Sequence, residues 1–146
     1  SMAENRPGGK TMQLRSLGRV LLVDDNDRYA DALTADLQAR GAEVIRAYDA
    51  TEGVRRLREE DPPFDGVVTD ISMETQVSGL RVLREARRRG IRLIAVASTG
   101  LDTPIGYFLN RLILGRLLGG THLIPKRPIK QRGEILWIPT NRDRRG

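Results

Sequence analysis

Apolar runs of strand length alternate with amphipathic segments of helix length along most of this chain. Between the runs, apolar residues recur at the spacing of a helix that buries one face. Such alternation favours a parallel sheet with helices on both faces, because two parallel strands need a long crossover that is usually a helix. The expected strands lie at residues 19–23, 43–48, 64–73, 91–97 and 121–124. We therefore predict an α/β fold of the doubly wound type.

Carboxylates stand at the carboxyl ends of two of these strands. Asp24 and Asp25 directly follow the first strand, and Asp70 lies at the tip of the third. Ligands of open α/β sheets bind at this edge. Three carboxylates crowded there repel one another unless a hard cation with oxygen ligands, such as Mg²⁺, lies between them. The pattern predicts a magnesium site, and it makes Asp70 a candidate phosphate-accepting nucleophile.

Hydroxyls and a cation follow the last two strands. Ser98 and Thr99 come after the fourth strand, and Lys126 comes after the fifth. An acid nucleophile, a metal-binding acid pair, a hydroxyl and a lysine are the groups that phosphoryl transfer to a carboxylate needs. With these features in this order, the stretch of roughly residues 19–130 resembles the receiver domain of two-component response regulators.

The resemblance implies a flavodoxin-like three-layer sandwich with a five-stranded parallel sheet in the order 2-1-3-4-5. It implies that Asp70 is the phosphoacceptor and that Mg²⁺ contacts Asp25 and Asp70 directly and Asp24 through water, with the Ser72 backbone carbonyl as a further ligand. The phosphoryl donor would be a sensor histidine kinase or a phosphotransfer protein. Such a domain catalyses only its own phosphorylation and dephosphorylation, and it signals through a downstream protein partner.

The hydroxyl position has two alignments. Without a gap, the fourth strand places Ala97 at the family's serine or threonine position, whereas one extra residue in the strand places Ser98 there. We choose Ser98, with Thr99 behind it, as the hydroxyl that contacts the phosphate.

The cation position is also ambiguous. The family's lysine directly precedes proline, but here Arg127 stands between Lys126 and Pro128. Either Arg127 is an insertion or it replaces the lysine. We favour Lys126, because its distance from the preceding glycine pair at 119–120 matches the family without a gap.

The carboxyl-terminal third departs from the family pattern. Residues 98–119 form a longer segment than usual, and the apolar face over residues 105–118 is wide enough to dock a partner protein or a second copy. Leu123 stands where a switch aromatic is normally found. Because residues 131–139 are short, β-branched and interrupted, we expect no full fifth helix. Either the chain is truncated there, or an extended strand places Trp137 over the apolar face of the preceding helix.

Three regions follow from these patterns. Residues 1–17 lack periodicity and read as a disordered leader that begins with a cloning remnant; residues 18–130 form the receiver domain. Residues 131–146 form an atypical segment with a basic tail. A chain of 146 residues suits one such domain.

Composition excludes several other classes of protein. There is no cysteine, the single histidine is His122, and no apolar run approaches the roughly 20 residues that span a bilayer. We expect a cytoplasmic protein that does not bind membranes. The net charge of +6 comes from arginines dispersed along the sequence without interleaved aromatics, so nucleic-acid binding is not expected.

Two rival functions share part of the pattern. A pseudo-receiver would use the same fold as a phosphate-independent interaction module. An aspartyl-phosphate phosphatase would need a second acid two residues after the nucleophile, where this chain has Ser72. The first rival is the stronger alternative.

Overall fold

The structure, a computed structural model, describes residues 14–71, 76–99 and 119–140. The six strands within these ranges join one sheet in the order β2-β1-β3-β4-β5-β6, in which β1 to β5 are parallel and β6 is antiparallel to β5. The predicted parallel sheet and its strand order are confirmed. The elements are β1 (Gly18–Val23), α1 (Asp27–Ala39), β2 (Ala42–Ala47), α2 (Ala50–Glu59), β3 (Gly66–Asp70), α3 (Gln76–Arg88), β4 (Leu93–Ser98), β5 (His122–Pro125), α5 (Lys126–Arg132) and β6 (Ile138–Pro139).

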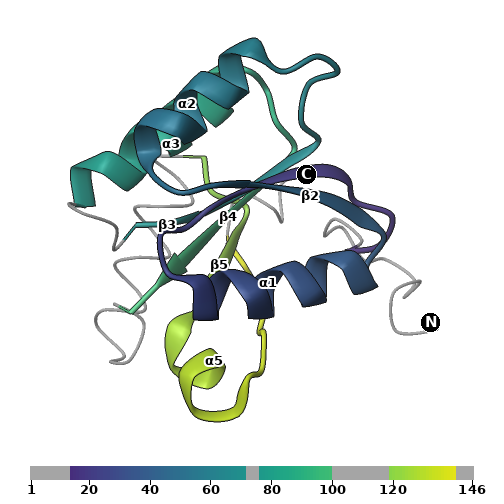
Figure 1. Ribbon diagram of the computed structural model, residues 1–146, viewed down its shortest axis with the longest axis vertical. Coiled ribbons are helices and arrows are strands. Elements are labelled where there is room, and N and C mark those ends of the chain that lie inside the picture. The colour runs from purple at the N-terminus through teal and green to yellow at the C-terminus, as the bar shows by residue number, and fades with distance from the viewer. Residues whose placement is uncertain (1–13, 72–75, 100–118, 141–146) are drawn as a thin grey trace.

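Helices cover both faces of the sheet, with α2 and α3 on one side and α1 and α5 on the other (Figure 1). The apolar strands supply both cores, because successive side chains of a strand point to opposite faces. In β3, for example, Val67 packs in the core beneath α2 and α3, whereas Val68 packs in the core beneath α1. This alternation decides which strand-tip side chains share a face.

Side-chain caps set the first turns of two helices. Asn26 precedes α1 and accepts a hydrogen bond from the Tyr29 N–H at 3.1 Å. Asp49 precedes α2 and accepts from the Glu52 N–H at 2.7 Å. Each cap satisfies a backbone donor that has no partner within the helix, and the first cap holds the chain directly after the acid pair in place.

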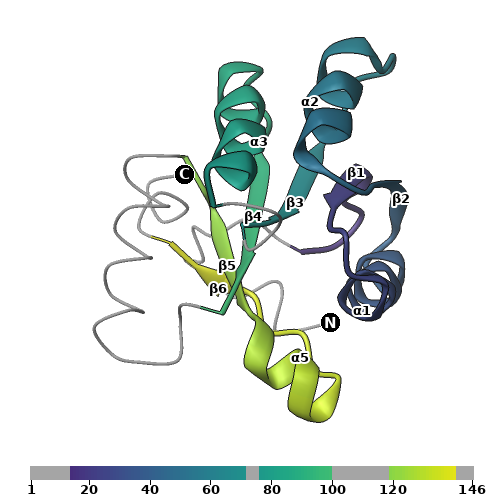
Figure 2. The same ribbon diagram turned by 60° about the vertical axis from the view of Figure 1, so that its left-hand side comes forward.

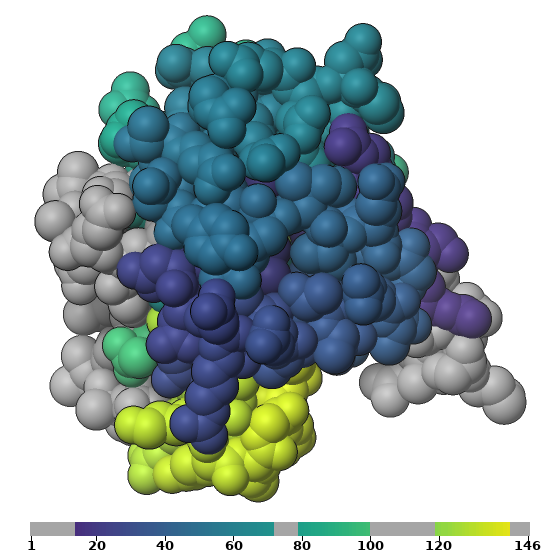
Figure 3. All heavy atoms as spheres, viewed as in Figure 1, coloured from purple at the N-terminus to yellow at the C-terminus, as the bar shows by residue number. Residues whose placement is uncertain are grey.

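The chain does form a fifth helix, but a short one. Helix α5 has seven residues and ends at Gly133, whose φ of 65° lies in the left-handed region that favours glycine. On the surface it lies beside α1 (Figure 3), and Arg28 of α1 donates to the Lys130 carbonyl at 3.1 Å. The chain then turns back and adds β6 to the β5 edge (Figure 2). We expected no full-length fifth helix. The chain has a short helix at this place, followed by a two-residue strand.

Trp137 packs between α1 and the β5 edge of the sheet. Its indole Nε1 donates to Asp36 of α1 at 2.8 Å, and the guanidinium of Arg40 stacks 5.6 Å from the centre of its ring. On the sheet side, it meets His122 edge to face at 6.0 Å. The helix that we expected Trp137 to cover lies outside the described residues. The described contacts of Trp137 are with α1 and β5, because the turn after α5 brings it to that face.

We expect Trp137→Ala to lower the free energy of unfolding by about 2 kcal/mol, because truncation removes the ring that joins α1 to the β5 edge. Urea denaturation followed by circular dichroism measures the change. The matched control is Tyr48→Ala, whose side chain is 56% exposed. That variant should stay within about 0.5 kcal/mol of wild type. Equal losses in the two variants would contradict this role of Trp137.

Within the described ranges, the helices are all too short or too polar to cross a bilayer.

Candidate phosphoacceptor site

The three acids meet at the carboxyl edge of the sheet, as the strand pattern predicted. Strands β1 and β3 are neighbours in a register that pairs Val23 with Thr69, so the residues that follow lie side by side. Asp24, Asp25 and Asp70 can each offer a carboxylate oxygen within 4.8 Å of the others. Asp24 and Asp70 are buried, whereas Asp25 is exposed. The cluster is therefore anchored in the core and open to solvent on one side.

Asp24 is the most perturbed acid of the cluster. Its side chain is 0% exposed, and its Oδ1 accepts a hydrogen bond from the Asn26 N–H at 2.9 Å. Burial raises the pKa of Asp24 to about 6, the hydrogen bond opposes this rise, and the nearby charge of Asp70 adds to it. The other oxygen, Oδ2, is buried without a hydrogen-bond partner. A buried polar atom without a partner is costly, so this oxygen needs one.

The residues of the cluster fit a hard divalent cation. Its donors are all carboxylate oxygens, and Oδ2 of Asp24 lacks a partner that a cation or its bound water would supply. Asp24, Asp25 and Asp70 would hold the ion. Ser72, whose backbone carbonyl we expected as a further ligand, lies outside the described residues.

Lys126 brings a buried cation to the cluster. It is the first residue of α5, directly after β5, and its Nζ donates to Asp70 Oδ2 at 2.5 Å. Its ammonium also lies 4.5 Å from the centre of the Tyr29 ring on α1. Arg127, the alternative cation, is exposed. Of the two cations that the sequence left open, Lys126 is thus the one that reaches Asp70.

The pairing of β3 with β4 bears on the hydroxyl position. The register sets Ala97 directly beside Asp70. Ala97 belongs to the same core as Val68, on the face to which Asp70 points, and alternation along the strand assigns Ser98 to the other face. Ser98 is buried and Thr99 is exposed. The strand pairing thus favours the ungapped alignment, in which Ala97 lies beside the acid in the register.

Two supporting residues of the site were missed in the sequence. Tyr29 places its ring beside Lys126, and Gly79 lets α3 approach the tip of β3. A Cβ at Gly79 would lie 2.7 Å from Ile71 Cα and 3.1 Å from the Asp70 carbonyl oxygen. Any side chain there would push α3 away from the strand tip that carries Asp70. Neither role has a sequence signal, because a tyrosine on a helix and a glycine before an apolar stripe are both common.

The fold is a doubly wound sheet with an acid cluster at its carboxyl edge. A lysine follows the last parallel strand, and this lysine pairs with one of the acids. Together these features define the receiver class of domain. A family model described as the response regulator receiver domain matches residues 20–106. Since this match covers more than half of the sequence, the chain belongs to the response regulator receiver family.

Solved structures support the same fold. A response regulator receiver domain protein from Clostridium thermocellum superposes with a TM-score of 0.60 at 27% identity, covering 76% of this chain and 83% of that one. A response regulator receiver protein from Pseudomonas putida gives 0.55 at 26% identity, with 75% and 85% covered. Chemotaxis protein CheY4 of Vibrio cholerae gives 0.59 at 23% identity, with 76% and 88% covered.

Proposed function

We propose that the protein is a phosphoacceptor of a two-component relay, which takes a phosphoryl group on Asp70 with the help of Mg²⁺. The observation that carries the proposal is the juxtaposition of Asp70 with a buried lysine on one side and two further acids on the other. A structural salt bridge would need only the lysine and one acid. The additional acids repel one another and destabilise the site without a bound ion. Such a destabilising cluster is typical of a site that binds a cation and a phosphate.

In the proposed transfer, the residues of the site have distinct roles. A carboxylate oxygen of Asp70 attacks the phosphorus of the donor, the bond from phosphorus to the donor's leaving atom breaks, and an aspartyl phosphate forms. Asp24, Asp25 and Asp70 would hold Mg²⁺, which would neutralise charge on the transferring phosphoryl group when bound. Lys126 already donates to Asp70 Oδ2, and its ammonium can follow the new charge onto the phosphate. The domain would turn over no metabolite and would catalyse only its own phosphorylation and dephosphorylation.

We predict the partners and the cellular location of the protein from this role. A sensor histidine kinase or a phosphotransfer protein would supply the phosphoryl group. A downstream protein, or a second copy in a homodimer, would dock on the face that includes residues 105–118, which lies outside the described residues. A cytoplasmic location suits this role.

A phosphate-independent pseudo-receiver is the second candidate function. Two observations favour it. The register pairs Ala97 with Asp70, and β6 already occupies the β5 edge beside which a receiver's signal emerges. Both features weaken the route by which a phosphate would be sensed, although they leave Asp70 and its acids in place.

A single labelling experiment separates the two functions. The protein is incubated with Mg²⁺ and a small-molecule phosphodonor, and an added phosphoryl group is sought by intact mass. A phosphoacceptor gains one group that is labile to acid and to hydroxylamine. A protein that gains none under conditions that label a known receiver is a pseudo-receiver.

We expect Lys126→Ala to keep phosphoryl uptake but to lose the conformational response, because the ammonium that follows the new charge is gone. Arg127→Ala, one residue along and exposed, is the matched control and should respond like wild type. Tryptophan fluorescence of Trp137, with and without a beryllium fluoride mimic of the phosphate, measures the response. A response lost in Arg127→Ala but kept in Lys126→Ala would show that Arg127 is the working cation.

A further inference from the structure

The end of α3 concentrates positive charge that its neighbours do not balance. Residues 81–89 contain five arginines and a single acid, Glu85. On α2, by contrast, Arg55 and Arg56 pair with acids of the same region, Glu52, Glu59 and Glu60. The two helices lie side by side on one face of the sheet (Figure 1). The excess charge therefore belongs to α3.

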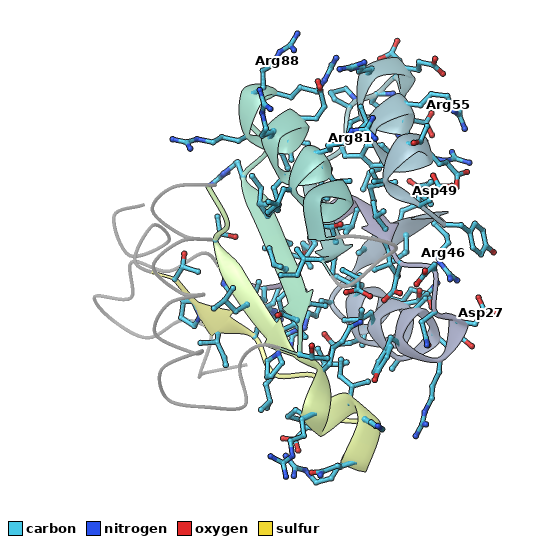
Figure 4. The ribbon with its side chains drawn as sticks, turned by 90° about the vertical axis from the view of Figure 1, so that its left-hand side faces the viewer. Asp27, Arg46, Asp49, Arg55, Arg81 and Arg88 are labelled. Carbon is cyan, nitrogen blue, oxygen red and sulfur yellow. The ribbon has the colours of Figure 1, made fainter. Side chains whose placement is uncertain are left out.

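Four of these five arginines, together with Arg58 of α2, line a groove between the two helices. The groove has a volume of about 780 Å³. Figure 4 shows Arg81 and Arg88 along α3 and Arg55 on the neighbouring α2. The lining residues are Val54, Arg58, Arg81, Arg84, Glu85, Arg87 and Arg88. Its volume is in the range of sites that bind small ligands.

The single acid of the groove already accepts a hydrogen bond on each of its oxygens. Glu85 is buried, and its two oxygens accept from Arg58 at 3.2 Å and from Arg89 at 2.7 Å. The bond from Arg89 is the main cause that holds the pKa of Glu85 below its usual range despite its burial. Glu85 therefore stays charged and is already engaged by the two arginines. The groove consequently presents donors to a ligand and almost no acceptor.

Three of the arginines have N–H donors that are available to a ligand. Arg81, Arg84 and Arg88 are exposed, and within the described residues none of them donates a hydrogen bond, although the charge of Arg88 acts on the nearby Glu85. Their spacing of three and four residues sets them on one face of α3, over about two turns. Arg87 is different, because its stem packs against the backbone at Gly119. The free guanidinium groups form a row along one wall of the groove.

We propose that this groove binds a compact oligophosphate anion. A guanidinium fork matches phosphate oxygens with two parallel hydrogen bonds, and arginine is the only free cation in the lining. A peptide would bring backbone N–H groups that find no free acceptor here. A base would find no aromatic ring among the lining residues to stack on. Phosphate chains have acceptors alone, so they complement a wall of donors.

The test is calorimetric titration of the 146-residue chain with tripolyphosphate in EDTA, which removes any contribution from a metal at the acid cluster. The triple variant Arg81→Gln, Arg84→Gln, Arg88→Gln should bind at least about tenfold more weakly than wild type. The control Arg55→Gln removes an exposed arginine from α2 outside the groove and should change affinity by less than about twofold. Circular dichroism melting confirms that the variants are folded, since all four side chains are exposed.

Several outcomes would overturn the proposal. Wild type that does not bind tripolyphosphate overturns it, as does an equal loss in the triple variant and in Arg55→Gln. Tighter binding of a single-stranded oligonucleotide or of an acidic peptide, lost in the same triple variant, would assign the groove to a macromolecule. The Asp70→Asn variant should bind tripolyphosphate like wild type, so this result is independent of the phosphoacceptor function.

Discussion

Asp70→Asn is expected to abolish phosphoryl uptake, with no added mass after incubation with Mg²⁺ and a phosphodonor that labels wild type. The amide has nearly the size of the carboxylate but is a far weaker nucleophile, and it carries no charge for a cation to neutralise. Lys126 would lose its ionised partner at 2.5 Å but keep an oxygen acceptor in the same place. The fold should therefore survive while the chemistry does not.

The control is Asp27→Asn at the start of α1. Asp27 is 78% exposed and pairs with Arg46 at 3.0 Å, so this variant removes an acid that is not a member of the cluster. The separate hydrogen bond from Arg46 Nε to the Asp24 backbone carbonyl, at 2.9 Å, does not involve Asp27. It should be labelled to the same extent as wild type. Undiminished labelling of Asp70→Asn would place the phosphoryl group on another residue and end the proposal.

Asp24→Asn is expected to stabilise the protein in EDTA by about 3 kcal/mol at pH 8, because it removes the cost of keeping a buried carboxylate ionised. The pKa of Asp24 rises from 3.8 to about 6 on folding. Between these values the folded state holds a proton that the unfolded state has lost, so stability falls as pH rises through this window. Above about pH 6 the penalty is complete. Urea denaturation between pH 4 and pH 8 measures it, and the gap between variant and wild type should close toward pH 4.

Magnesium gives the second half of the test. At ten times its dissociation constant, a bound ion should stabilise wild type by about 1.4 kcal/mol. Asp25→Asn, at the exposed member of the cluster, should lose this response and also melt higher than wild type in EDTA. Equal Mg²⁺ stabilisation of wild type and Asp25→Asn would refute the metal site. A gap between Asp24→Asn and wild type that is independent of pH would refute the ionisation argument.

Strand periodicity alone located the sheet and its acid edge. Strands with strong apolar runs, such as β3 and β4, were found because their side chains are buried on both faces, and this leaves a mark in the sequence itself. Acids that directly follow such strands must lie at the carboxyl edge. The resemblance then supplied the strand order, which the local pattern does not contain.

Tertiary structure decided the features that depend on which face a side chain takes or on contacts between distant segments. A one-residue offset at the end of β4 exchanges Ala97 for Ser98 beside Asp70, and the sequence permits either register. Trp137 reaches Asp36, 101 residues away, only because α5 is short enough for the chain to turn back. In the sequence, the arginines of α3 read as part of a dispersed charge. In the structure, several of them line one groove, because α3 packs beside α2. Periodicity reports the burial of a residue, whereas the identity of its neighbour depends on how the elements pack.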